Sequence, residues 1–363
     1  MDGARIDQLA RWLSRDASRR KITKATAGSL LAAVTLGRLP VGLTQAQQAT
    51  PCPAPTPDEL RAIAEAYFDA FNTGDADALA RLLAPTYTHQ GALVSEQDRE
   101  LHQGRLRQNR AAFPDGRYAL DQIIAQDDLV AIRHVFTGTL QAPYAGVEPA
   151  GQAVAVRGVH IHRVACGQIT ETWNNGDALG LLRQIGALPP AGPAPRTPEE
   201  AATGPQASPV ADCPSTTAAE NAAIGRRWTE EALDQHDLDV IDEIVAPDVV
   251  HHSGVFVDEI GRDALKANIQ AIFDGFPDSR FTADVVVAED DAVAVRWTAR
   301  GTHEAEFLGI APTGIPVEFT GTNVYRIARG LIVESWSEPD ARGLLTQLGA
   351  LPEIPPPVST PTS

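Results

Sequence analysis

The chain has 363 residues, of which 43% are hydrophobic and 21% are charged, so it is long enough for two globular domains of ordinary size. Its formal net charge is −17 at pH 7, and the first 46 residues carry eight basic and three acidic groups, which leaves −22 for the rest. Nucleic acid is not an expected partner of so acidic a chain.

The N-terminal segment, residues 1–46, is predicted to be an export signal peptide. Arg19 and Arg20 precede a mildly apolar run over 25–36, and Thr44-Gln45-Ala46 offers a small-residue cleavage site. This layout resembles a twin-arginine signal, although a basic amphipathic surface helix is the alternative. We therefore expect an extracytoplasmic protein, periplasmic or secreted, with no membrane span in the mature chain.

The mature chain contains two copies of one sequence, at 53–189 and 214–351. A Pro/Ala-rich linker at 190–212 separates them, and a Pro-rich tail at 352–363 is expected to be disordered. "DDLVAIR" from Asp127 matches "DDAVAVR" from Asp290, and the closing stretches "ETWNNGDALGLLRQIGALP" and "ESWSEPDARGLLTQLGALP" agree at 12 of 19 positions. Because there are only two copies and each is about 137 residues long, the repeat indicates a duplicated domain and not a solenoid.

Each copy places helical patterns before strand patterns. Thr56 and Glu59 form a predicted capping box, and a first amphipathic helix follows. A second short helix ends at Pro85, or at Pro247 in the other copy, and a third covers 96–113 or 259–276. The period then changes to two in β-branched runs. The predicted fold class is α+β, with helices on one face of an antiparallel sheet.

Two long stretches of the second copy carry a family resemblance. The segment from "FPDSRFTADVVVAEDDAVAVRW" to "SEPDARGLLTQLGALP", together with "LDQHDLDVIDEIVAPDVVHH", closely resembles the SnoaL-like polyketide cyclase (ester cyclase) branch of the NTF2-like superfamily. The resemblance implies two tandem cone-shaped α+β barrels, each with a strongly curved sheet around an apolar cavity. It also implies sheet-to-sheet pairing, so the two domains are expected to form an intrachain pseudo-dimer.

The resemblance implies an aspartate near the end of the last strand as the catalytic base. That residue removes a proton next to a carbonyl, and burial helps by raising the carboxyl pKa toward working pH. The matching residue is Asp340, with Asp177 as its twin. The alternative is that each aspartate is the N-cap of the terminal helical turn.

Several further side chains are candidates around such a cavity. Glu334 and Trp336 alternate along the last strand and are expected to share a face with Ile332, so Glu334 is either a second proton-transfer group or a surface or interface charge. Trp336 and its twin Trp173 are candidate ligand contacts, or else aromatic residues of the core or of the interface between the domains.

Two histidines follow the second helix of the second copy. His251 could polarise a carbonyl and His252 could contact a ligand, or they could be ordinary histidines at a helix exit. The matching position in the first copy is His89.

Asn323 and Tyr325 are predicted polar points within the second cavity, and their twins are His160 and His162. With His89 or His134, the latter two could in principle hold zinc or copper. The family resemblance implies no metal, and neither a metal nor a cofactor is predicted.

The cysteines provide a disulfide hypothesis. Cys52 and Cys213 each precede the first helix of a domain and could meet across a pseudo-twofold axis, with Cys166 left as an unpaired thiol.

Two function classes remain open from the sequence. The first is cofactor-free acid/base chemistry, of the cyclase or isomerase type, on a small apolar carbonyl compound, with the second domain the better candidate. The second is a non-catalytic module that binds an apolar small molecule, or an interaction scaffold. Phosphate-binding loops and serine-hydrolase elbows do not occur in the sequence.

Overall fold

The computed structural model describes residues 52–91, 95–96, 98–188, 216–254 and 258–351. The predicted signal peptide, linker and tail lie outside these ranges. Within them, no helix is both long and apolar enough to cross a membrane.

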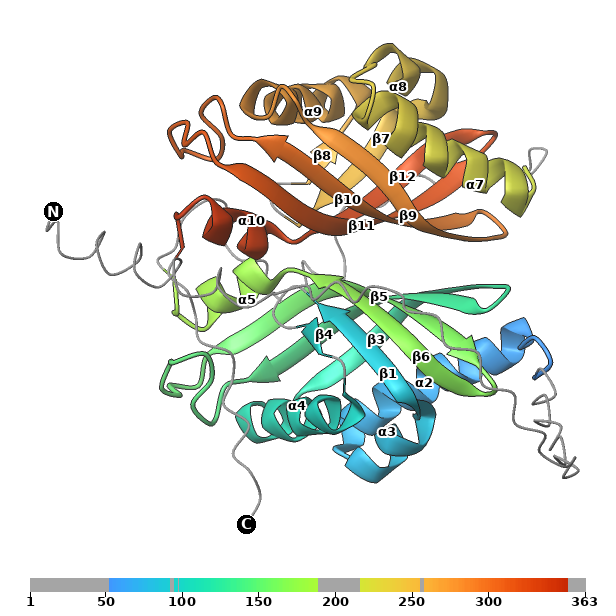
Figure 1. Ribbon diagram of the computed structural model, residues 1–363, viewed down its shortest axis with the longest axis vertical. Coiled ribbons are helices and arrows are strands. Elements are labelled where there is room, and N and C mark those ends of the chain that lie inside the picture. The colour runs from blue at the N-terminus through green and yellow to red at the C-terminus, as the bar shows by residue number, and fades with distance from the viewer. Residues whose placement is uncertain (1–51, 92–94, 97, 189–215, 255–257, 352–363) are drawn as a thin grey trace, which may run out of the picture. The chain divides into compact units, whose positions relative to one another are not determined.

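The first domain packs helices against one face of a sheet (Figure 1). The predicted capping box at its start is confirmed, because Glu59 N donates to Thr56 Oγ1 (3.3 Å) and Thr56 N donates to Glu59 Oε2 (2.8 Å). Gly74 ends the first helix in the left-handed conformation, with φ of 78°. The helices are α2 (Pro57–Thr73), α3 (Ala76–Leu82), α4 (Arg99–Ala112) and the terminal α5 (Ala178–Gln184).

The sheet of the first domain has the strand order β2-β1-β6-β5-β4-β3. Neighbours are antiparallel, as predicted, except for β1, which runs parallel to β6. The strand that follows the second helix, β1, lies directly beside the last strand of the domain, β6. The chain between these two strands forms the long crossover connection that parallel neighbours require. The strands are β1 (Leu83–Gly91), β2 (Ser95–Glu96), β3 (Arg117–Gln126), β4 (Leu129–Thr139), β5 (Ala153–Ala165) and β6 (Gln168–Gly176).

The second domain repeats this architecture, with sheet order β8-β7-β12-β11-β10-β9. Its first helix contains one extra residue, because Thr56 matches Thr217 but Phe71 matches Leu233. A π-helical turn absorbs the insertion. The elements are α7 (Ala218–Arg227), η1 (Trp228–Leu233), α8 (Asp239–Ile244), β7 (Val245–Ser253), β8 (Glu259–Ile260), α9 (Arg262–Gly275), β9 (Arg280–Glu289), β10 (Ala292–Thr302), β11 (Pro316–Ala328), β12 (Leu331–Pro339) and α10 (Ala341–Gln347).

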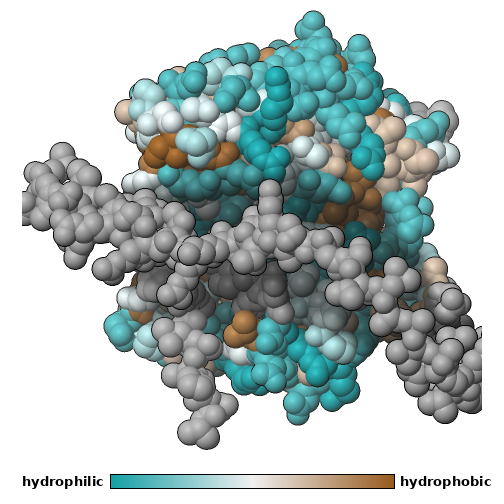
Figure 2. Space-filling model, viewed as in Figure 1, coloured by the Kyte–Doolittle hydropathy of each residue, from teal (hydrophilic) through white to brown (hydrophobic). Residues whose placement is uncertain are grey.

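Each domain buries its own core between helices and sheet, and a further cluster contains residues of both sheets, among them Ile161, Trp173, Val287 and Trp336. By contrast, the outer surface of α8 and α9 is mostly hydrophilic (Figure 2). The predicted fold, two tandem α+β domains, is confirmed.

The contact between the two sheets is reciprocal. Gln126 and Glu289 occupy equivalent positions in the two copies. Ala288 N donates to Gln126 Oε1 (2.8 Å), and Ala125 N donates to Glu289 Oε2 (2.9 Å). A twofold relation brings the same surface patch of each copy into contact with its equivalent. The two halves therefore contact each other as the subunits of a pseudo-dimer do.

Candidate active site

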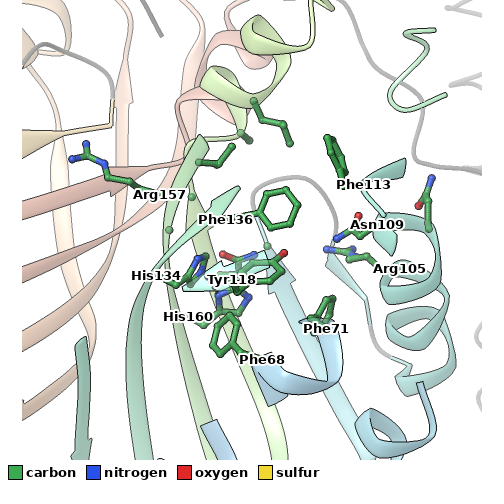
Figure 3. A pocket seen from close by; sticks show the side chains of 18 of the residues that line it. Phe68, Phe71, Arg105, Asn109, Phe113, Tyr118, His134, Phe136, Arg157 and His160 are labelled. Atoms are coloured by element: carbon green, nitrogen blue, oxygen red, sulfur yellow. Dashed lines mark hydrogen bonds between the residues drawn. The ribbon is translucent and has the colours of Figure 1, made fainter. Parts of the chain in front are cut away.

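A cavity of about 180 Å³ lies in the first domain, and all of its lining residues belong to that domain except Arg342. Strands β4 and β5 supply His134 and His160 on one side, while α4 supplies Arg105 and Asn109 on the other (Figure 3). Phe68 and Phe71 of α2, with Phe113 and Phe136, make much of the remaining lining aromatic. The space is therefore apolar in body with a few polar groups, as is usual for small-molecule sites.

His134 and His160 form the central polar pair of the cavity. They stand on neighbouring antiparallel strands, and His134 Nε2 lies 2.8 Å from His160 Nδ1, so one ring donates to the other. The Phe68 ring packs about equally close to both imidazoles. Burial lowers the pKa of His134 to about 3 and holds that of His160 well below its usual value, and both rings are therefore neutral at pH 7.

The Tyr118 hydroxyl is the adjacent donor. Its ring meets that of His134 edge-on at 5.2 Å, and both residues line the cavity. Burial raises the pKa of Tyr118, while a hydrogen bond with Asn109 opposes the rise. The phenol therefore stays protonated and is able to donate a hydrogen bond at any physiological pH.

Three more buried histidines extend this polar set. His102 Nε2 lies 2.8 Å from the Tyr67 hydroxyl, and the rings of His102 and His89 are 4.8 Å apart. His162 lies against Tyr67 with its Nδ1 2.9 Å from Thr172 Oγ1, while its Nε2 has no hydrogen-bond partner within the described residues. Of the predicted site residues, His89 and His160 thus line the cavity, and His162 lies directly behind it.

In the second domain, Trp297 stands where His134 stands in the first, and it belongs to the buried core cluster of that domain. Its indole Nε1 donates to Asn323 Oδ1 (3.1 Å), and Asn323 Nδ2 donates to the Tyr325 hydroxyl (2.8 Å). Asn323 and Tyr325 do lie on the inner face, as predicted, but they bond to each other and to the tryptophan. Their environment is a packed core, so the cavity described here favours the first domain over the second.

Asp340 and Asp177 act as helix N-caps in both domains. Gly343 N donates to Asp340 Oδ1 (2.8 Å), and Gly180 N donates to Asp177 Oδ1 (2.6 Å). Burial raises the pKa of Asp340, and the bond from Gly343 opposes that shift. Neither aspartate belongs to the residues that line the cavity, so the geometry favours the capping role that the sequence left open.

Glu334 and Trp336 do not share a face with Ile332. The pairing of β12 shifts register between Ile332 and Glu334, and such a bulge turns the following side chains over. Ile332 therefore packs in the core of its own domain, whereas Trp336 belongs to the cluster shared with the first domain. The expectation of a common face is wrong, because the bulge interrupts the alternation of side chains along the strand.

Glu334 is part of a charged network on that outer face. It accepts from Arg326 (3.1 Å) and lies 3.1 Å from His252 Nε2, and His252 Nδ1 lies 2.9 Å from Asp258. Burial opposes the charge on both partners, yet the two carboxylates raise the pKa of His252, and His252 and Arg326 lower that of Glu334. His252 also stacks on Trp336 at 5.2 Å. Trp173 lies in the same shared cluster, so these residues belong to the contact between the domains.

His251, in contrast, points into its own domain. Its Nδ1 lies 2.7 Å from Ser335 Oγ, and burial lowers its pKa to about 4. The pairing confirms the sequence equivalence with His89, because His89 lies opposite Thr172 just as His251 lies opposite Ser335.

The predicted pairing of Cys52 with Cys213 is wrong. Cys52 is bonded to Cys166, so the expectation of an unpaired Cys166 is wrong as well. Cys166 lies in the β5–β6 hairpin turn, beside the start of α2. The disulfide of Cys52 is therefore formed within the first domain and not across the pseudo-twofold axis. Cys213 lies outside the described residues.

Across the described ranges, no group of three or more His, Cys, Asp or Glu is placed to hold a metal ion.

Sequence reasoning missed His102, Arg105 and Asn109, and considered His134 only as a metal ligand. A signal was available in the comparison of the two copies. These four inward positions are polar in the first domain, whereas three of their equivalents in the second, Leu265, Ile272 and Trp297, are apolar and the fourth is Asn268. A polar residue at a position where its twin is apolar marks a site that packing alone does not explain.

Fold and cavity together define a class of protein: a tandem of NTF2-like domains, one of which encloses a largely apolar cavity. The chain belongs to the SnoaL-like polyketide cyclase family, whose model matches residues 61–185 and 223–348.

Solved structures similar to single domains of this chain include three Streptomyces proteins. AclR from Streptomyces galilaeus is 33% identical over 38% of this chain and 91% of its own, with a TM-score of 0.35. IdmH from Streptomyces antibioticus is 35% identical over 36% and 96%, with a TM-score of 0.31. TsrD from Streptomyces laurentii is 28% identical over 37% and 99%, with a TM-score of 0.35. No curated protein matches the chain.

Proposed function

We propose that the first domain performs cofactor-free acid/base chemistry of the cyclase or isomerase type on a small carbonyl compound. The observation that carries this proposal is the buried His134–His160 pair, with its 2.8 Å contact, which faces the cavity beside the Tyr118 ring. Membership of the SnoaL-like polyketide cyclase family supports the reaction type.

In this mechanism a neutral imidazole of the pair removes the proton from the carbon next to the carbonyl. The electrons of the broken C–H bond form an enolate, and the Tyr118 hydroxyl donates a hydrogen bond to its oxygen. The enolate then attacks a second carbonyl of the same molecule, and the imidazolium gives its proton to the alkoxide that forms. In an isomerisation, the imidazolium instead returns the same proton to the enolate at another position, so atoms and electrons balance without an oxidant.

The low pKa of the pair is compatible with this role. Burial lowers the pKa of His134 to about 3, because a lone imidazolium would be poorly solvated there. An enolate forming next to the ring supplies the opposite charge, which favours the protonated imidazole. Proton transfer then creates a neutral ion pair rather than a buried net charge.

A ligand-binding role without turnover is the second candidate. It is favoured by the absence of any carboxylate among the described residues that line the cavity. Deuterium exchange distinguishes the two roles without knowledge of the substrate.

The test follows exchange of the α-protons of 2-tetralone in D2O by NMR, with and without the protein. We expect acceleration by the wild-type protein and a loss of about 10²–10⁴-fold in His160→Gln. Arg107→Gln, an exposed change on α4, is the matched control and should retain the full rate. Calorimetric binding of 2-tetralone without any acceleration would reject catalysis and support the binding role.

We also propose that the protein is exported through its twin-arginine-like segment. The Cys52–Cys166 disulfide supports an oxidising destination. Replacing both Arg19 and Arg20 by Lys should keep the full-length chain inside expressing cells, whereas unchanged processing and export would contradict a twin-arginine route.

A further inference from the structure

The charged residues of the first-domain cavity are all basic. Arg105 of α4, Arg157 of β5 and Arg342 of α10 line it, and none of its described lining residues is Asp or Glu. The lining histidines add no negative charge, and the chain as a whole has a net charge of −17. A purely cationic cavity in so acidic a protein calls for an explanation beyond general surface charge.

The three arginines differ in what they do. Arg157 Nε lies 3.4 Å from Glu338 Oε1 of the second domain, and its Nη2 donates to the Ser253 carbonyl (2.9 Å), so its charge serves the contact between the domains. Its side chain extends away from the other labelled groups (Figure 3). Arg157 is therefore a poor candidate for contact with a ligand.

Arg105 and Arg342 both act on the same part of the cavity. Burial raises the pKa of the lining residue Tyr144, and the positive charges of Arg105 and Arg342 oppose that rise. Arg105 also opposes the rise in the pKa of Tyr118, after the larger effects of burial and of Tyr144. Two guanidinium groups from different domains thus place positive potential around one phenol.

The second copy lacks this arrangement. Asn268 stands where Arg105 stands in the first domain. In the reverse direction, Leu179 is the equivalent of Arg342, and it is buried in an apolar cluster. Divergence after the duplication has therefore given the first-domain cavity a cation from each half of the chain.

We propose that the first-domain cavity binds a small carboxylate, with the carboxylate between Arg105 and Arg342 and the apolar body against Phe68, Phe71 and Phe136. This inference rests on the proposed function in using the same cavity, and it narrows the substrate class to acidic carbonyl compounds. Planar guanidinium groups match carboxylate oxygens in geometry and charge. A volume of about 180 Å³ is below the roughly 300–1,000 Å³ of pockets for drug-sized ligands, so the ligand is small.

The test compares cinnamate with cinnamamide, which share shape and differ in charge, by isothermal titration calorimetry on the mature two-domain protein at pH 7. We expect cinnamate to bind about tenfold or more tightly, and the preference to shrink as salt increases. Arg105→Gln should remove most of the preference, and Arg342→Leu, which installs the residue of the other copy, should reduce it. Arg107→Gln on the exposed face of α4 should leave it intact.

Equal affinities for acid and amide, or no binding of cinnamate, would overturn the inference, as would an unchanged preference in Arg105→Gln. If that variant fails to fold by circular dichroism, the comparison of acid and amide on the wild-type protein still decides. The measurement needs no turnover. A failure here with intact 2-tetralone exchange removes only the carboxylate assignment, while a clear preference without exchange rejects only the catalytic role.

Discussion

Trp297 occupies in the second domain the strand position that His134 occupies in the first, and each side chain packs over a glycine directly opposite on the neighbouring strand. The partners are Gly321 and Gly158. A Cβ atom at Gly321 would lie 2.2 Å from the indole, and one at Gly158 would lie 2.9 Å from the imidazole. A glycine on the neighbouring strand thus makes room for a large indole side chain in one copy and for a polar imidazole in the other.

This relationship predicts different costs for truncating the two side chains. Trp297→Ala should lower the free energy of unfolding by about 3–5 kcal/mol, because it empties a packed core, and should leave cinnamate binding unchanged. His134→Ala should cost less, because His134 already borders a cavity, but should weaken the binding of 2-tetralone. Urea unfolding and calorimetry on both variants provide the comparison. Equal stability losses would show that both inner faces are equally packed.

The capping role of the terminal aspartates leads to a second prediction. Asn is as good an N-cap as Asp, so Asp340→Asn should keep both stability and activity near those of the wild-type protein. Asp340→Ala removes the bond to Gly343 N and should cost about 0.5–2 kcal/mol. The measurements are urea unfolding and the 2-tetralone exchange rate. Loss of exchange in Asp340→Asn at unchanged stability would restore Asp340 as the base.

The fold could be predicted from the sequence because its signals are local and repeated. The capping box, the change of period and the two matching copies each depend on residues close in the chain. The bulge before Glu334 could not be predicted in this way, because one extra residue in a strand leaves no clear mark in an alternating pattern and yet reverses the face of all that follows.

The location of the open cavity also escaped prediction, for a reason of volume. Phe68 packs on His134 in the first domain and Phe71 lines the same cavity, whereas the second domain has Thr229 and Leu233 with Trp297. Whether space remains depends on how such sets fit together in three dimensions, and neither copy reveals that by itself. The partner of Cys52 escaped prediction for a related reason, because it depends on which segment lies close in three dimensions. That segment is the hairpin turn of the same domain that contains Cys166.

The buried histidines predict an acid-labile protein. Burial lowers the pKa of both His134 and His162 to about 3 and of His251 to about 4, while the unfolded chain binds protons near pH 6.5. Between these values the unfolded state holds more protons, so the stability present above pH 6.5 is lost as the pH falls toward 3.

Each such histidine contributes up to about 1.4 kcal/mol per pH unit in this window. Urea unfolding from pH 7.5 to 4.5 should show the decline, and His134→Gln should make it shallower by one histidine's share. His252, whose pKa is raised by Asp258 and Glu334 against the effect of burial, acts in the opposite direction and loses its contribution as the pH rises. Stability independent of pH across this range would contradict the neutral state of the inner histidines.

The Cys52–Cys166 bond predicts a covalent link within the first domain, and it spans 114 residues. In the chain-entropy model a loop of about this length stabilises the folded state by roughly 4–5 kcal/mol, so Cys166→Ser should lower the unfolding midpoint strongly. Cys213→Ser is the matched control and should leave the midpoint unchanged. Non-reducing peptide mapping should recover the peptides of Cys52 and Cys166 as one linked species that reduction separates. A linked species containing Cys213 instead would restore the pairing between the two domain starts, and with it a covalent tie across the pseudo-twofold axis.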